Sequence, residues 1–259
     1  MTAAAFDLRD EVRRTPGALD IGDAFDAESR QAAIAEWTQR MVHAHVGSRL
    51  FAGLLPQMMR AGVDSGFQAA AAEAVVDELR HARLCAAVVD ALGGRACAPV
   101  PEHSDVPRHD GASPLEALLR NVLSIVCLDE TVVVAQLEHR HRNARQSTLR
   151  RVIAEILDDE INHSRLGWRL LQNLSPRIDA GMRERLGAYL VPAFTRLFDE
   201  HLGGAGSNAV DSKTVFVDAI NEVIVPRLEA VELPARAAVE AVLAAPDAED
   251  DVIAWPATD

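Results

Sequence analysis

The sequence DELRHARL at residues 77–84 returns as DEINHSRL at residues 159–166, and five of the eight positions are identical. In an α-helix, residues three positions apart lie on the same face. Glu78 with His81, and Glu160 with His163, would therefore each present a carboxylate beside an imidazole. The repeated DExxH pattern predicts two similar helices that carry the same pair of side chains.

Apolar residues around both copies indicate that the pairs face the protein interior. One apolar stripe continues through Glu160 and His163, and another surrounds Glu78 and His81. Glu130 lies in a third stripe of the same kind. In the order given, the stripes are Ile153, Ile156, Leu157, Gly167 and Leu171; Ala74, Val75, Cys85, Val88 and Leu92; and Leu119, Leu123, Val126, Val133 and Leu137.

Three inward glutamates raise an energetic problem that bound cations would solve. Desolvation of each ionised carboxylate is unfavourable by several kcal/mol, and like charges repel one another. A single ExxH on a helix is more often a solvated charge pair than a ligand set. Two inward copies with an inward glutamate between them favour a site for a pair of divalent metal ions.

The sequence predicts helices throughout the chain, because Ala, Leu, Arg and Glu dominate its long segments while Gly and Pro cluster at a few positions. The Pro-rich segment RACAPVPEHSDVPRHDGA predicts a long connection between the second and third helices. A frayed acidic tail is expected at the end of the chain. The helices are expected at about 27–62, 66–92, 113–143, 147–174, 178–203 and 211–244.

Capping residues support several of these boundaries. Asp26 is expected to open the first helix, and Gly62 to close it. Ser113 combines with Pro114 and Glu116 in a capping box at the start of the third helix. The second helix ends at the Gly93-Gly94 pair. The short connections after the first and third helices predict two antiparallel hairpins joined by the long connection.

The duplicated DExxH pattern with an inward glutamate on the third helix resembles the ferritin-like di-iron carboxylate superfamily, which includes ferritins, rubrerythrins, small ribonucleotide reductase subunits and various oxidases and oxygenases. The resemblance covers about residues 27–174. It implies an all-α fold, a ferritin-like four-helix bundle with additional C-terminal helices. Residues 1–26 would be an N-terminal extension, and residues 175–259 a C-terminal helical extension with its tail.

Residue by residue, the resemblance implies five metal ligands, of which Glu78 and Glu160 would bridge the two metals. Asp77 and Asp159 stand four residues before the histidines, where each can reach across the bundle to hold the imidazole N–H of the partner helix. The alternative for both is a plain surface aspartate. The implied ligands are Glu78, His81, Glu130, Glu160 and His163.

The first helix departs from the superfamily, which usually supplies an acidic ligand there. The window Met41–Ser48 holds no acid. His45 shares a face with the inward stripe and is the candidate sixth ligand, although a core histidine is equally compatible with its position. His43 falls off the stripe, and Glu36 lies about two turns away.

Carboxylate and imidazole ligands suit iron or manganese, and the resemblance favours two iron ions. The leading hypothesis is an oxidase or oxygenase that activates O2 and oxidises a small organic substrate. Alternatives are a ferroxidase or metal-handling protein and a metal-free structural or binding bundle. Small residues near the ligands either leave room for a substrate or allow close helix packing. They are Gly47, Ser48, Cys85, Cys127 and Gly167.

Several features narrow the range of superfamily members that the chain can resemble. Tyr189 lies beyond the four predicted bundle helices, which argues against a tyrosyl-radical subunit, and the chain has no rubredoxin-like cysteine pairs. The C-terminal extension would cover the bundle, close a pocket or form a homodimer interface. His201 and the run 138–142 are interpreted as solvated charges at helix ends.

Composition excludes other classes of protein. The formal net charge of −13 opposes binding to nucleic acid. The three cysteines lack the spacing of a disulfide framework, which fits a reducing cytoplasm. The N-terminus has no signal-peptide pattern, and no apolar run is long enough to predict a membrane span.

Overall fold

The computed structural model describes most of the chain and is mostly helical, so the all-α class is confirmed at that level. The chain divides into two compact units, each built from two separate segments. The first unit comprises residues 1–108 and 140–159, and the second comprises residues 109–139 and 160–259. The described residues are 5–14, 19–21, 25–101, 105–202 and 210–245.

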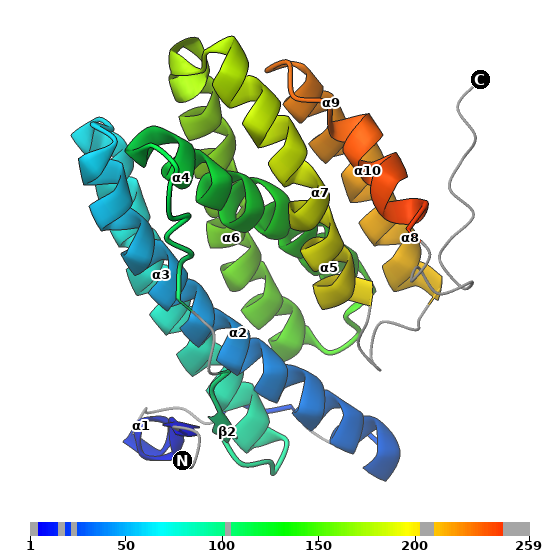
Figure 1. Ribbon diagram of the computed structural model, residues 1–259. Helices are drawn as coiled ribbons and strands as arrows, with labels where there is room; N and C mark the ends of the chain where they lie inside the picture. The colour runs from blue at the N-terminus through cyan, green and yellow to red at the C-terminus, as the bar shows by residue number, and fades with distance from the viewer. Residues whose placement is uncertain (1–4, 15–18, 22–24, 102–104, 203–209, 246–259) are drawn as a thin grey trace. The chain divides into compact units, whose positions relative to one another are not determined.

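A long helical hairpin forms the centre of the first unit. Its helices are α2 (Ala27–Arg60) and α3 (Ser65–Ala91), which lie side by side in Figure 1. Asp26 caps α2 by accepting a hydrogen bond from the Ser29 backbone N–H at 2.8 Å. At the other end Gly62 adopts a left-handed φ of +65°, which glycine permits without steric penalty. The predicted boundaries of both helices agree with the structure to within two residues.

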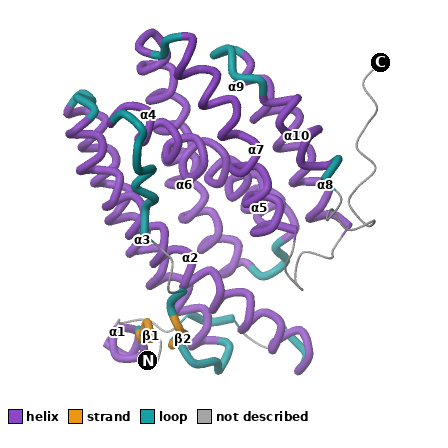
Figure 2. The backbone as a smooth tube through the Cα atoms, in the orientation of Figure 1, coloured by secondary structure: helices purple, strands orange, loops and turns teal. Residues whose placement is uncertain are grey.

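The first unit also contains structure that the sequence did not predict. Strand β1 (Ala5–Asp7) pairs antiparallel with strand β2 (Cys97–Pro99), as Figure 2 shows in orange. Helix α1 (Arg9–Arg14) follows β1 directly. The strands are too short to produce a readable alternation of apolar and polar residues. The N-terminal residues are thus tied to the long connection after α3.

The second unit opens with the helix that follows this connection. Ser113 caps α4 (Pro114–Asn121) by accepting a hydrogen bond from the Glu116 backbone N–H at 3.2 Å, as the capping box predicts. The chain then forms a π-helix, η1 (Val122–Asp129), and continues as α5 (Glu130–Asn143). The prediction of one α-helix over 113–143 therefore missed the π-helix. Such helices are rare and often lie at functional sites.

Helix α6 (Ser147–Leu174) has the predicted bounds, and both α5 and α6 contribute residues to each unit. A single 3-10 turn, η2 (Ser175–Arg177), leads to α7 (Ala180–Leu202), close to the predicted 178–203. In the second unit, α7 packs against α4, η1 and the later helix α10 (Ala235–Leu243).

The predicted helix at 211–244 is wrong as a single element. The chain forms α8 (Val210–Asp218), a second π-helix η3 (Ala219–Ile224) and α9 (Val225–Glu229) before α10. A turn separates α9 from α10. In this turn Glu232 has a φ of +60°, and Pro234 cannot donate a backbone hydrogen bond. The predicted acidic tail, residues 247–259, lies outside the described residues.

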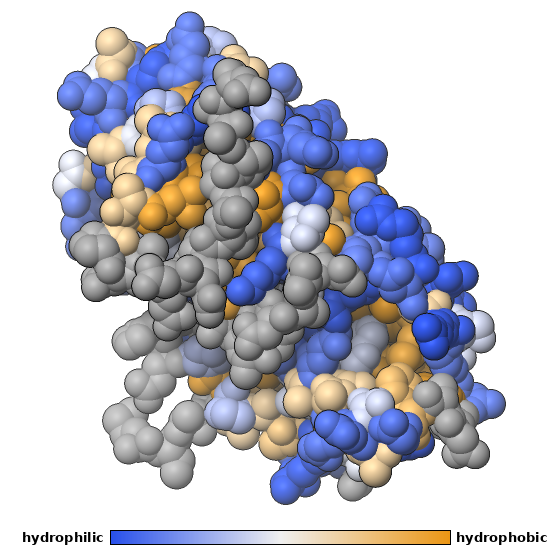
Figure 3. Space-filling view, turned by 90° about the vertical axis from the view of Figure 1, so that its right-hand side faces the viewer, coloured by the Kyte–Doolittle hydropathy of each residue, from blue (hydrophilic) through white to orange (hydrophobic). Residues whose placement is uncertain are grey.

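Each unit has its own apolar core. Met41, Phe51 and Leu54 of α2 are completely buried in the first unit, and Phe194 of α7 and Phe216 of α8 are completely buried in the second. The surface face in Figure 3 is mostly hydrophilic, with hydrophobic side chains gathered in a few places. Among the described helices, none combines the length and the apolar character that crossing a bilayer requires.

Candidate metal centre

Three buried side chains converge in the second unit. Glu130, Glu160 and His163 each offer a ligand atom, and these atoms lie within 4.8 Å of one another. Glu130 and Glu160 are each 6% exposed, and His163 is 3% exposed. Two carboxylates and an imidazole, buried together at this spacing, form a cluster within metal-binding distance.

Two helices supply the cluster. Glu130 is the first residue of α5, directly after the π-helix η1. Glu160 and His163 lie three residues apart on α6, and His163 Nδ1 is 3.1 Å from Glu160 Oε2. Thr131 joins the same two helices, because its hydroxyl lies 3.0 Å from the Ser164 hydroxyl. This bond fixes the position of α5 against α6 next to the cluster.

The first copy of the motif has a similar internal geometry in the first unit. Glu78 and His81 of α3 are 4% and 1% exposed, and His81 Nδ1 lies 3.7 Å from Glu78 Oε2. In both copies the histidine thus turns Nδ1 toward its own glutamate. The Glu78 carboxylate lies against Gly47 of α2, where an added Cβ would be 2.9 Å from the carboxylate carbon. Gly47 therefore leaves the space that the Glu78 side chain occupies.

Asp159 makes the contact that its spacing suggested. Its Oδ2 atom lies 2.9 Å from His81 Nε2, within the first unit. Arg80 also donates to Asp159, and it donates to Glu155 at 2.7 Å. Asp77 accepts a bond from Arg80 at 3.3 Å. The bond that Asp159 accepts favours a proton on His81 Nε2, which leaves Nδ1 as the basic nitrogen on the side of Glu78.

His45 lies on a different flank of α2 from the residue that faces Glu78. It is two residues from Gly47, which corresponds to a rotation of about 200° around the helix. Its ring stacks on Phe6 of β1 with a centroid separation of 3.9 Å. The buried Nδ1 atom has no hydrogen-bond partner in the described part of the chain, and burial lowers the pKa of His45. This geometry does not favour His45 as a ligand.

His43 and Glu36 of α2 have surroundings that do not favour them as ligands either. His43 is exposed. Glu36 accepts hydrogen bonds from Arg40 at 3.2 Å and from Arg140. Burial, together with the charge of Arg40, lowers the pKa of Arg140 to about 10. Arg140, which the sequence suggested as a solvated charge, forms an ion pair with Glu36 and keeps 36% of its side chain exposed.

The interpretation of His201 as a solvated histidine is wrong. Its side chain is only 6% exposed, and its Nε2 atom lies 2.7 Å from Asp129 Oδ1. The Gln136 amide lies 3.1 Å from the opposite ring nitrogen. Sequence spacing gives no signal for these contacts, because the histidine lies 72 positions after its aspartate.

The small residues pack the helices closely. An added Cβ at Gly167 of α6 would lie 2.9 Å from Val126 of the π-helix, and Gly47 accommodates the Glu78 side chain in the same way. Cys85 and Cys127 are buried free thiols. Burial raises the pKa of Cys127 well above its ordinary value, so this thiol is unreactive. At Gly47 and Gly167 the geometry therefore supports close helix packing and not a substrate pocket.

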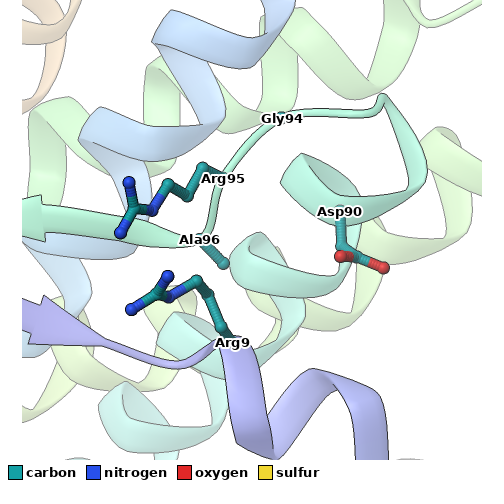
Figure 4. A pocket seen from close by; sticks show the side chains of 5 residues that line it. All are labelled: Arg9, Asp90, Gly94, Arg95 and Ala96. Atoms are coloured by element: carbon teal, nitrogen blue, oxygen red, sulfur yellow. The ribbon is translucent and has the colours of Figure 1, made fainter.

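One surface pocket lies in the first unit. It is lined by Arg9, Asp90, Gly94, Arg95 and Ala96, none of which is a predicted ligand. Figure 4 shows the guanidinium groups of Arg9 and Arg95 pointing to the same side, with Asp90 on the other. Arg9 is paired with Asp7 at 2.8 Å, which compensates its charge.

The donor set fits hard divalent metals, because oxygen and imidazole ligands suit iron and manganese. Two carboxylates at the spacing of the cluster are favourable in a buried position only when a cation or protons neutralise them. Comparisons with protein-family models, with curated proteins and with solved structures found no match. The chemical interpretation therefore rests on the motif repeat and on the buried cluster.

Proposed function

We propose that the chain is a dinuclear-metal protein of the ferritin-like type that uses two iron ions to activate O2. The buried cluster of Glu130, Glu160 and His163 is the observation that carries the proposal. Glu78, the glutamate of the first DExxH copy, would add a third carboxylate ligand. His81 would serve the second ion.

The repeat supports an assignment of two ions. Each DExxH copy offers one glutamate and one histidine, and Glu130 adds a third carboxylate. Three carboxylates would neutralise most of the charge of two divalent ions, and the histidines would add neutral donors. Manganese suits the same ligands, so the identity of the metal is part of the proposal.

The side chains have separate tasks in this scheme. Asp159 would accept the Nε2 proton of His81, so that Nδ1 would be the nitrogen that binds metal. The bond between Thr131 and Ser164 would keep Glu130 on α5 in place against Glu160 on α6. Burial of the cluster would limit the access of water. Iron bound at this site would supply redox chemistry with O2, and the substrate would be a small organic molecule.

Reaction with oxygen distinguishes the proposed enzyme from a ferroxidase. Protein loaded with Fe(II) under anaerobic conditions is mixed with O2, and oxygen uptake and absorbance are followed with a panel of small organic compounds. An oxidase or oxygenase should respond to one class of compound with faster turnover and an oxidised organic product. Iron oxidation that no compound alters would favour the ferroxidase.

The matched variants are Glu130→Gln in the cluster and Glu73→Gln on the exposed surface of α3. The cluster variant should lose oxygen uptake, and the surface variant should retain it. Wild-type protein that takes up no metal would contradict both the oxygenase and the ferroxidase and would favour a metal-free bundle.

A further inference from the structure

We propose that helix α7 braces the π-helix η1 and thereby sets the direction in which Glu130 projects. Its consequence for metal binding rests on the proposed function, but the bracing itself does not. Both elements belong to the second unit, where they pack against each other. The proposal gives the C-terminal part of the chain a role at the metal centre, with His201 as a positioning residue.

Three side chains of α7 reach the π-helix. The Tyr189 hydroxyl donates to the Ser124 hydroxyl at 3.3 Å, and Arg196 donates to the Ser124 carbonyl at 3.3 Å. His201 bonds to Asp129 at 2.7 Å. Ser124 lies near the beginning of η1, and Asp129 is its last residue. The bonds from α7 thus hold η1 at two places.

The contact between His201 and Asp129 is the one closest to the cluster, because Asp129 precedes Glu130 directly. The Gln136 amide, 3.1 Å from His201 Nδ1, donates to that nitrogen. The remaining ring proton then lies on Nε2 and points at the Asp129 carboxylate. Gln136 belongs to α5, so His201 ties the end of η1 and the following helix to α7 at once.

A π-helix needs such support, because its hydrogen-bond geometry is rarely favoured over that of an α-helix. A π turn contains about one residue more than an α turn. If η1 relaxed to α-helical geometry, the residues after it would rotate by about 100° relative to α4. Glu130 would then no longer project toward Glu160 and His163. The bonds from α7 oppose this change.

Hydrogen bonds within the segment from α4 to α5 distinguish the π-helical from the α-helical conformation of η1 less strongly. The Ser124 hydroxyl donates to the Arg120 carbonyl at 3.1 Å, and the Thr131 hydroxyl donates to the Cys127 carbonyl at 2.6 Å. Both span four residues, a spacing that is also common for hydroxyl groups in α-helices. Contacts from another helix depend on where η1 places Asp129 and Ser124. Therefore α7 is the element expected to select the π conformation.

The test uses the full chain and compares His201→Ala with His201→Gln, whose amide can still donate to Asp129. Amide hydrogen exchange of residues 122–130 is measured by mass spectrometry on metal-free protein. The alanine variant should exchange about tenfold faster or more, as expected when a hydrogen bond to a charged group is lost. The glutamine variant should restore most of the protection. Asp199→Asn, an exposed neighbour on α7, should match the wild type.

Metal binding supplies the second measurement. Mn(II) affinity should fall about 10- to 100-fold in His201→Ala, the range seen when a supporting residue of a metal site is lost, and should recover in His201→Gln. If His201→Ala does not fold, the double variant Tyr189→Phe with Arg196→Met removes the two bonds to Ser124 and should give the same faster exchange.

Unchanged exchange of residues 122–130 in either variant that folds would overturn the proposal. A wild type that binds no Mn(II), combined with faster exchange in His201→Ala, would contradict the proposed function and leave the brace supported. The two failures are therefore distinguishable.

Discussion

Replacing Glu160 with glutamine should change the stability of the protein in opposite directions with and without metal. Glu160 and Glu130 have ligand atoms within 4.8 Å of each other, so two ionised carboxylates repel by about 3 kcal/mol at an effective dielectric constant near 20. The substitution removes that repulsion and keeps the shape of the side chain. It also weakens the bond between Glu160 and His163, by about 1 kcal/mol, because an amide oxygen still accepts a hydrogen bond.

The metal-free variant should therefore be more stable than the metal-free wild type by about 2 kcal/mol. The order should reverse when metal is present. A ligand at 100 times its dissociation constant stabilises the folded state by about 2.7 kcal/mol, and the variant should gain much less because it binds metal more weakly. The free energies of unfolding are measured by urea denaturation, once with a chelator and once with excess Mn(II). Glu73→Gln is the control with a charge change at an exposed position.

One result would refute this reasoning. If Glu160→Gln is less stable than wild type by the same amount in chelator and in Mn(II), then Glu160 is only a hydrogen-bonding partner of His163. The cluster would in that case be satisfied without metal.

Three further substitutions test other parts of the site. Asp159→Ala should weaken Mn(II) binding about 10- to 100-fold in an equilibrium titration, because His81 loses the acceptor at 2.9 Å, and unchanged affinity would remove Asp159 from the site. Gly47→Ala should lower the free energy of unfolding by about 1–3 kcal/mol, because its Cβ would lie 2.9 Å from the Glu78 carboxylate, whereas a stabilised variant would show that Glu78 moves freely. His45→Ala should keep its metal and lose about 1 kcal/mol of stability at pH 8 through its stacking on Phe6, and a lost metal ion would restore His45 as a ligand. This variant should also be less sensitive to acid, because the lowered pKa of His45 makes the wild type lose stability as the pH falls through about 6.5, where the unfolded state binds the proton more readily.

The helices of the first unit and the cluster of the second could be predicted because local signals determine them. Asp26 and Gly62 mark the ends of α2, and both adopt the capping geometry expected of their residue types. Glu130, Glu160 and His163 lie in apolar stripes, so their burial follows from helical periodicity. Their role as metal ligands remains a prediction, and so does the four-helix arrangement.

Non-local contacts explain most of what the sequence did not predict. The α-helical spacing of apolar residues does not reveal the extra residue per turn in η1. Neighbouring positions there are also apolar, so a shift by one residue still places an apolar side chain in the stripe. The burial of His201 depends on Asp129, and the stacking of His45 depends on a strand that pairs with residues 97–99. Pro234 was a readable signal, since proline disfavours a continuous helix, and weighting it more strongly would have divided 211–244.

Metal content is the most direct test of the central claim. Protein produced with added iron and purified without chelator is analysed by elemental mass spectrometry, alongside Glu130→Gln, Glu160→Gln and the surface control Glu73→Gln. Two ligand sets predict about two ions per wild-type chain and the same in the control, with about one or none in each cluster variant. Equal metal content in all four proteins, or no metal in the wild type, would contradict a dinuclear site built from the repeated motif.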